Sequence, residues 1–314
     1  MNKAIFNIDN KRVWVAGSRG LVGTACISIL KRQKCVLVND PHRTVLDLRN
    51  EGDVYDFIQQ EKPDVIVLAA AKVGGIGDNA VNGDAFYHEN RAIQNAVINA
   101  AAQNNVEKLV FLGSSCIYPR DCPQPIQEKY LETGALEKTN EGYARAKIEG
   151  IRLCQEHRRN GHDFISLMPC NLYGENDHFI SGARPHVIPA LIMKLKQAIE
   201  NKDSSITVWG TGKPLREFMH VDDLAGAIVH ALRHYSKAEP LNVGSGSEVS
   251  INELVRVLCN ISGYKGNVVF DSSMPDGTPR KILDSSKMRS LGWMPKISLQ
   301  EGLSSVWRQA SCQG

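Results

Sequence analysis

One stretch near the start of the chain decides the fold: Arg12-Val13-Trp14-Val15-Ala16-Gly17-Ser18-Arg19-Gly20-Leu21-Val22-Gly23. Residues 12–17 are typical of a buried strand, and the pattern that follows predicts a helix over residues 21–33. The glycines between them have the spacing GxxGxxG, which lets the backbone turn sharply and approach a pyrophosphate at the positive end of the helix. Glycines alone could form only a tight turn. In a strand–turn–helix unit they predict a dinucleotide-binding loop at Gly17, Ser18, Arg19, Gly20, Leu21, Val22 and Gly23.

Strands and helices alternate through the first half of the chain. The pattern predicts strands at residues 36–39, 64–70, 108–112 and 164–168, and helices at 53–58, 84–104 and 141–159. The run 64–70 is continuously apolar, as expected of a parallel strand covered on both faces. This alternation favours right-handed βαβ units and an α/β fold with a doubly wound parallel sheet of the Rossmann type.

The rhythm changes after Pro169. Further helices are predicted at residues 188–201, 251–261 and 299–310, and further strands at 206–209 and 267–270. Residues 218–235 and 241–243 could rejoin the first sheet. We therefore expect a Rossmann domain over residues 1–172, to which residues 216–244 return, and a smaller C-terminal substrate domain over residues 173–314.

Composition narrows the function classes. The 314 residues include 37 basic and 34 acidic ones, a net charge of +3, which argues against a nucleic-acid platform. No apolar run approaches the roughly 20 residues that span a bilayer, and the N-terminus lacks a signal-peptide core, so a cytoplasmic location is expected. The eight cysteines show neither CxxC pairs nor zinc spacing, and no metal site is predicted.

The end of the second predicted strand carries conflicting signals about the cofactor. An acidic residue such as Asp40 usually accepts the ribose hydroxyl bonds of NAD. Arg19 and Arg43 could instead clamp the 2′-phosphate of NADP. Asp40 could also do no more than cap a turn beside Pro41.

Two polar residues on a predicted helix point to proton transfer. Tyr143 and Lys147 are four positions apart and therefore share a helix face. Next to a pyridinium, Lys147 would lower the tyrosine pKa, and Tyr143 could deliver a proton to a carbonyl oxygen as a hydride reaches its carbon. The hydroxyl of Ser114, at the end of a predicted strand, could bind the same oxygen. If the next residues continue extended, Ser114 and Cys116 face the same way.

Longer stretches spread over nearly the whole chain add a resemblance. They are AAAKVGGI (69–76), FLGSSCIYP (111–119), NLYG (171–174), HVIPAL (186–191), VWG (208–210), REFMHVDD (216–223) and PDGTPRK (275–281). With the glycine loop and the Tyr143–Lys147 pair, they resemble the extended short-chain dehydrogenase/reductases, and within them the GDP-L-fucose synthase family. The stretches AAAKVGGI and FLGSSCIYP are more specific to this family than general reductase motifs are.

The resemblance implies a reaction and a set of site residues. The family epimerises carbons 3 and 5 of GDP-4-keto-6-deoxy-D-mannose and reduces its 4-keto group with NADPH. Ser114, Tyr143 and Lys147 match the reducing triad, Cys116 the epimerisation base and His186 the acid. The other positions that match cofactor contacts are Leu112, Gly113, Ser115, Pro169, Cys170, Asn171 and Leu172. Those that match contacts to the GDP-linked keto sugar are Lys194, Trp209, Arg216 and Lys281. A homodimer through the helices 84–104 and 141–159 is also implied.

Departures from the family keep two rival functions in view. Ser18 replaces a histidine, Cys170 a threonine and Lys194 often an arginine, and the acidic Asp40 region replaces a basic pattern. One rival is a reductase of a related GDP-keto sugar, such as a deoxyheptose, without epimerisation, in which Cys116 is only a packed thiol. The other is a nucleotide-sensing protein, which would have no use for the Tyr143–Lys147 pair.

Overall fold

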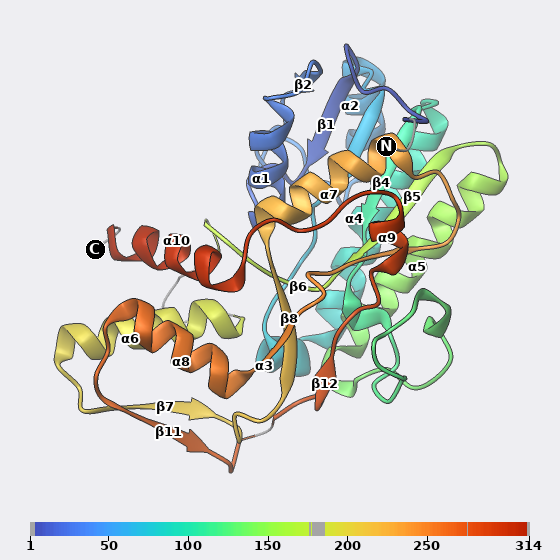
Figure 1. Ribbon diagram of the computed structural model, residues 1–314. Coiled ribbons are helices and arrows are strands. Elements are labelled where there is room, and N and C mark those ends of the chain that lie inside the picture. The colour runs from blue at the N-terminus through green and yellow to red at the C-terminus, as the bar shows by residue number, and fades with distance from the viewer. Residues whose placement is uncertain (1–3, 176, 178–185, 275, 313–314) are drawn as a thin grey trace.

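The computed structural model of the chain describes residues 4–175, 177, 186–274 and 276–312 (Figure 1). Its centre is a six-stranded parallel sheet with the strand order β2-β1-β3-β4-β5-β9. The strands are β1 (Arg12–Ala16), β2 (Val36–Val38), β3 (Val65–Leu68), β4 (Lys108–Leu112), β5 (Asp163–Pro169) and β9 (Leu241–Val243). The chain runs outward from β1 to β2 and then returns to β3, so the strand order reverses there and opens a crevice at the carboxyl ends. The predicted doubly wound fold is confirmed.

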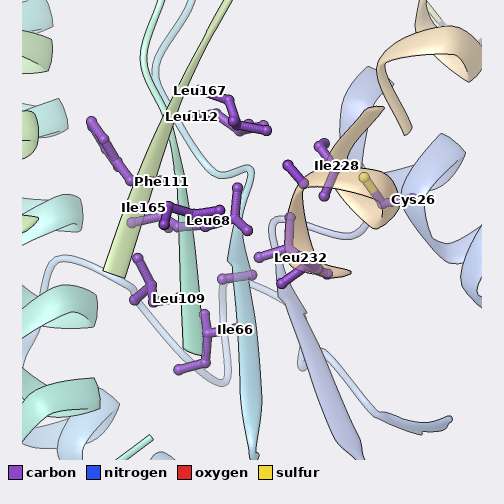
Figure 2. Packing of buried hydrophobic residues seen from close by; sticks show 14 of the residues in the cluster. Cys26, Ile66, Leu68, Leu109, Phe111, Leu112, Ile165, Leu167, Ile228 and Leu232 are labelled. Carbon is purple, nitrogen blue, oxygen red and sulfur yellow. The ribbon is translucent and has the colours of Figure 1, made fainter. Parts of the chain in front are cut away.

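Helices cover both faces of this sheet. On one face α1 (Leu21–Leu30) packs against α7 (Val221–His234), and on the other α4 (Gly83–Gln103) contacts α2 (Glu51–Glu61) and α5 (Glu141–Arg159) (Figure 1). Figure 2 shows Ile228 and Leu232 of α7 and Cys26 of α1 on one side of β3, the strand that carries Ile66 and Leu68. These side chains are at most 1% exposed, and each buried aliphatic one stabilises the fold by roughly 1.5–3 kcal/mol.

A second region lies beside the carboxyl ends of the strands (Figure 1). In its larger sheet β8 (Leu215–His220) pairs antiparallel with β10 (Glu248–Ser250) and parallel with β12 (Arg280–Lys281) and β6 (Asn171–Tyr173). β7 (Ser205–Trp209) and β11 (Asn267–Asp271) form a separate parallel pair. α6 (Val187–Asn201), α8 (Ile251–Ser262) and α10 (Leu299–Cys312) pack around a second apolar cluster.

Short elements are where the structure differs from the sequence-based predictions. β9 lies in the main sheet and α7 packs against α1 beside it, but β8 belongs to the smaller sheet. The strands β6, β10 and β12 have two or three residues each, too few for a hydrophobic period to appear. The other elements not predicted are α3 (Ile76–Val81), α9 (Ser286–Ser290), η1 (Ser115–Ile117), η2 (Glu128–Tyr130) and η3 (Lys138–Asn140). Among the helices of the described ranges, none has the length and apolar character needed to cross a membrane.

Candidate active site

The glycine loop joins β1 to α1 at the crevice. Gly17 has φ +90°, and a Cβ there would lie 2.7 Å from the Ala70 backbone nitrogen. A Cβ at Gly23 would lie 2.0 Å from the Gly17 carbonyl oxygen, so the packing of the loop itself excludes side chains at both positions. At Gly20 the nearest atom would be 3.6 Å away, and no side chain caps the start of α1. The loop therefore leaves an open helix N-terminus that fits a pyrophosphate.

The charged residues at the end of β2 are bonded mainly to the protein itself. Asp40 Oδ1 accepts a hydrogen bond from Trp14 Nε1, and Asp40 Oδ2 accepts one from the Ser18 backbone N–H, both at 2.9 Å. The Arg19 guanidinium donates to the carbonyl oxygens of Asp40 and Pro41 at 3.0 and 2.9 Å. Arg43 lies farther along the chain, near Asp47. Hydrogen bonds from Arg49 lower the pKa of Asp47, and the charge of Arg43 lowers it further.

Lys147 is held at the inner end of the site. It is 3% exposed, and its Nζ donates a hydrogen bond of 2.8 Å to the Leu112 carbonyl oxygen at the end of β4. The Nζ lies 5.8 Å from the centre of the Tyr143 ring, one helical turn earlier on α5. Burial lowers the pKa of Lys147 to about 7, because the charged ammonium is desolvated.

The surroundings of the Tyr143 side chain favour its protonated phenol form. Burial raises the pKa of Tyr143 well above its usual range, and the nearby Cys116 thiol raises it further. A hydrogen bond with the Ser114 hydroxyl acts in the opposite direction. The sequence predicted that Lys147 would lower this pKa beside a pyridinium, but here desolvation dominates. The phenol is a proton donor next to Ser114.

Cys116 reaches the site through a turn. Ser114 is extended, with φ −163°, but residues 115–117 form the 3-10 helix η1, and Ser114 Oγ accepts a hydrogen bond of 3.1 Å from the Cys116 backbone N–H. The prediction of an extended segment with both side chains on one face was therefore wrong, because the Ser114 hydroxyl caps a helical turn. The half-buried thiol nevertheless influences the pKa of both Tyr143 and Arg216, which places it between α5 and β8.

The remaining predicted cofactor residues follow the ends of β4 and β5, two neighbouring strands. A Cβ at Gly113 would lie 2.4 Å from Met168 Sδ, so glycine permits the close approach. Ser115 and Cys170 are buried, and Asn171 Nδ2 donates to the Glu217 carbonyl oxygen at 2.9 Å. The loop 112–115 and the segment 169–172 therefore lie side by side at the crevice.

The predicted sugar-nucleotide residues lie on the second region. Arg216 of β8 pairs in register with Lys281 of β12, and its guanidinium donates to the Leu215 carbonyl oxygen at 2.9 Å. Burial lowers the pKa of Arg216, while the nearby Cys116 raises it. On β7, Trp209 is 61% exposed, and Lys194 Nζ donates to the Thr207 carbonyl oxygen at 2.6 Å.

Two predicted positions lie at the margins of the described ranges. His186 is the exposed N-cap residue of α6. Pro275, in the stretch 275–281, lies outside the described residues. The structure thus pairs Arg216 with Lys281 and brings Arg216 near Cys116, and it holds Lys194 of α6 against β7, the strand that carries Trp209.

Comparisons with known proteins show the family of the chain. The model of the NAD dependent epimerase/dehydratase family matches residues 13–244. The chain belongs to this family. It is 48% identical to a GDP-L-fucose synthase of Sinorhizobium fredii (strain NBRC 101917 / NGR234) over 95% of each chain. It is 50% identical to GDP-L-fucose synthase 1 of Arabidopsis thaliana over 94% of this chain and 92% of that one. It also resembles a solved GDP-mannoheptose C4 reductase from Campylobacter jejuni with NADP bound, with 34% identity, a TM-score of 0.86 and coverage of 98% and 99%.

One acidic residue of this epimerase/dehydratase-family chain escaped the sequence-based prediction. The Asp276 carboxylate accepts hydrogen bonds of 2.7 Å from both the backbone N–H and the hydroxyl of Thr211, just after Trp209. Its backbone carbonyl accepts a 3.4 Å bond from Arg216, so Asp276 links two candidate substrate residues. Asp276 lies in the stretch PDGTPRK (275–281), but no role was predicted for it. In the structure Gly210, with φ +83° and no Cβ, leaves room for its carboxylate.

Proposed function

We propose that the chain converts GDP-4-keto-6-deoxy-D-mannose to GDP-L-fucose, by epimerisation at carbons 3 and 5 and NADPH-dependent reduction of the 4-keto group. The observation that carries the proposal is the 48–50% identity to named GDP-L-fucose synthases over more than nine-tenths of both chains. The gathering of Ser114, Cys116, Tyr143 and Lys147 at the end of β4 supports it, because a generic nucleotide-binding protein has no need of that cluster.

The crevice fits NADP. The open N-terminus of α1 suits the pyrophosphate, and Arg19 provides a cation at the end of β2. In this proposal the cofactor is held by residues 17–23, 112–115 and 169–172, with Lys147 and His186. NADPH, when bound, supplies the hydride that reduces carbon 4.

Reduction also requires a proton at the carbonyl oxygen. Tyr143 carries that proton because its pKa is raised, and the Ser114 hydroxyl orients the same oxygen. The pKa of Lys147 is about 7, and its Nζ lies 5.8 Å from the centre of the Tyr143 ring. In this proposal Lys147 supplies the proton that restores the phenol after transfer.

Epimerisation requires a base and an acid on opposite faces of the sugar. The 4-ketone acidifies the C–H bonds at carbons 3 and 5, because the carbanion formed is an enolate. In this proposal Cys116 removes each proton, and His186 returns a proton from the opposite face, which inverts the centre. The Arg216 guanidinium, within electrostatic reach of Cys116, is well placed to bind the diphosphate of the same ligand.

The sugar nucleotide then lies between the two regions. We propose that residues 1–172, with 216–244, carry NADP and that the rest of residues 173–314 carries the GDP-sugar. Trp209 offers an exposed indole for stacking on guanine, while Lys194, Arg216 and Lys281 offer cations for the diphosphate. A cytoplasmic homodimer through α4 and α5 completes the proposal, and the mass in solution by light scattering tests the dimer.

One rival keeps specific support. The likeness to a GDP-mannoheptose C4 reductase favours a chain that reduces a GDP-keto sugar without epimerising it. In that case Cys116 would be a packed thiol and His186 a structural residue.

A single incubation separates these functions. The protein is mixed with GDP-4-keto-6-deoxy-D-mannose and NADPH in D₂O, and the sugar is identified by NMR. The proposal predicts GDP-L-fucose with deuterium at carbons 3 and 5. A reduced sugar of unchanged configuration without deuterium would establish the reduction-only rival, and failure to oxidise NADPH would exclude both enzymes.

A further inference from the structure

Asp40 occupies the place where Rossmann-type folds commonly put a ribose-binding carboxylate. Its side chain is only 8% exposed, and both of its oxygens already accept hydrogen bonds from this chain, one from Trp14 Nε1 and one from the Ser18 N–H. We propose that Asp40 is a positioning residue that holds the phosphate-binding loop, and that it does not select between phosphorylated and unphosphorylated ribose. The proposal rests on the proposed function only in taking this loop as the cofactor site.

The contact with Trp14 explains why a carboxylate stands at position 40 even when no ligand is bound. The indole is fully buried in β1 and packs on Phe57, with ring centres 4.8 Å apart. Its N–H can only donate, and a buried donor without an acceptor costs free energy. Asp40 supplies that acceptor, so the pair Trp14–Asp40 fixes the end of β2 against β1.

The same carboxylate fixes the loop through Ser18. Asp40 holds the Ser18 backbone N–H, and the Thr24 hydroxyl of α1 donates to the Ser18 carbonyl oxygen at 3.2 Å. The Ser18 residue is therefore bonded on one side to β2 and on the other to α1. A loop ordered in this way binds a pyrophosphate without the entropic cost of ordering itself.

Arg19, the next residue, is oriented by the same segment. Its guanidinium donates to the backbone carbonyls of Asp40 and Pro41, and its side chain is 56% exposed. The cation is thus presented outward at the end of β2, with N–H groups to spare for a phosphate. The recognition of a 2′-phosphate falls to Arg19, while Asp40 supports the loop that both nucleotides use.

This division of roles gives different expectations for the two residues. NADPH and NADH carry the same pyrophosphate, so a looser loop weakens both equally. Only NADPH carries the 2′-phosphate, so loss of the Arg19 charge weakens NADPH alone.

The test measures the dissociation constants of NADPH and of NADH by nicotinamide fluorescence, without sugar. Asp40→Asn is expected to weaken both by about tenfold with their ratio unchanged to within about threefold, as for the loss of one charge-assisted hydrogen bond. Arg19→Gln is expected to weaken NADPH by about tenfold and to leave NADH within about threefold.

Two further variants separate positioning from general stability. Thr24→Val removes the other bond to Ser18 with Asp40 intact, and is expected to weaken both nucleotides by a smaller, equal factor. If Asp40→Asn does not fold, the two dissociation constants of Thr24→Val test the proposal instead. The matched control is Asp64→Asn, because Asp64 Oδ2 accepts a 2.7 Å bond from the Arg12 N–H at the opposite end of β1. This control is expected to lower the melting temperature and to leave both dissociation constants unchanged.

The outcomes that overturn the proposal are distinct. A selective loss of NADH in Asp40→Asn would identify Asp40 as the ribose ligand, and a selective gain of NADPH would show that its charge repels the phosphate. Unchanged binding of both nucleotides would show that the loop needs no anchor. A wild-type protein that binds both nucleotides but does not turn over the sugar would refute the proposed reaction and leave this inference standing.

Discussion

The carboxyl end of the main sheet and the surface formed by β7 and β8 face the same proposed substrate, yet they are built differently. Lys147 is 3% exposed, and its ammonium is bonded to the Leu112 carbonyl deep in the fold. Trp209 is 61% exposed, and Lys194 and Arg216 are bonded to carbonyls of β7 and β8. Lys147 is fixed by packing, whereas Lys194 and Arg216 rest on local contacts that a ligand can replace.

This difference follows from what each region must do. Proton transfer needs donors held at a set distance before the substrate arrives, because reorganisation during the reaction adds to the barrier. Binding of a diphosphate needs cations that are not fully buried, because a fully buried one would pay a large desolvation cost when no anion is bound; Lys194, Arg216 and Lys281 are half-buried. Mutations in the first region should therefore change rates, and mutations in the second should change affinity.

The largest expected effect tests the first half of this comparison. Tyr143→Phe removes only the phenolic proton, so ketone reduction should fall on the order of 10²-fold or more, as for loss of a general acid. NADPH binding should stay near normal. Oxidation of NADPH at 340 nm with GDP-4-keto-6-deoxy-D-mannose measures the rate; near wild-type turnover would remove Tyr143 from the proposed triad.

Cys116→Ser sharpens the comparison, because the thiol lies between the two regions. Solvent deuterium should enter carbons 3 and 5 about 10²-fold more slowly, since serine is a far weaker base at neutral pH. The hydride site remains assembled, so reduction without inversion can appear. NMR of the product measures both; exchange as fast as in the wild type would mean that Cys116 is only a packed thiol.

Trp209→Ala tests the binding side. Loss of a stacked indole should weaken GDP binding by roughly tenfold, with little change in melting temperature, because the side chain is mostly exposed. Calorimetric titration with GDP measures the affinity. The matched control is Val269→Ala on the adjacent strand β11, where the valine is also more than half exposed and no contact with GDP is proposed. Equal effects of the two substitutions would contradict the stacking role.

A further expected effect concerns stability and pH. The pKa of Lys147 is about 7 in the folded protein and near 10.5 when unfolded, so the penalty for burying its charge is complete below pH 7 and fades toward pH 10.5. Lys147→Met removes that penalty. The melting temperature of the variant, relative to the wild type, should therefore be higher at pH 6 than at pH 9.5. A pH-independent difference would mean that Lys147 is not desolvated.

The local geometry predicted from the sequence agrees with the structure where spacing along one element decides it. Tyr143 and Lys147 share a face of α5 because they are four residues apart, and Gly17 and Gly23 bracket a loop between one strand and one helix. The prediction of an extended segment failed at Cys116, where the backbone N–H donates a hydrogen bond to Ser114 Oγ and the chain forms a turn. Side-chain capping of so short a turn leaves no periodic signal.

The sequence by itself determined the doubly wound sheet, the glycine loop and the helix that carries the Tyr143–Lys147 pair, because each depends on local periodicity. Only the tertiary structure decided that β8 leaves the main sheet and that Asp276 joins Thr211 to Arg216. The same holds for Asp40, which the sequence offered as a ribose ligand and whose oxygens are bonded to Trp14 and Ser18. These contacts join segments far apart along the chain, and which partner a buried polar group finds depends on packing that no local pattern records.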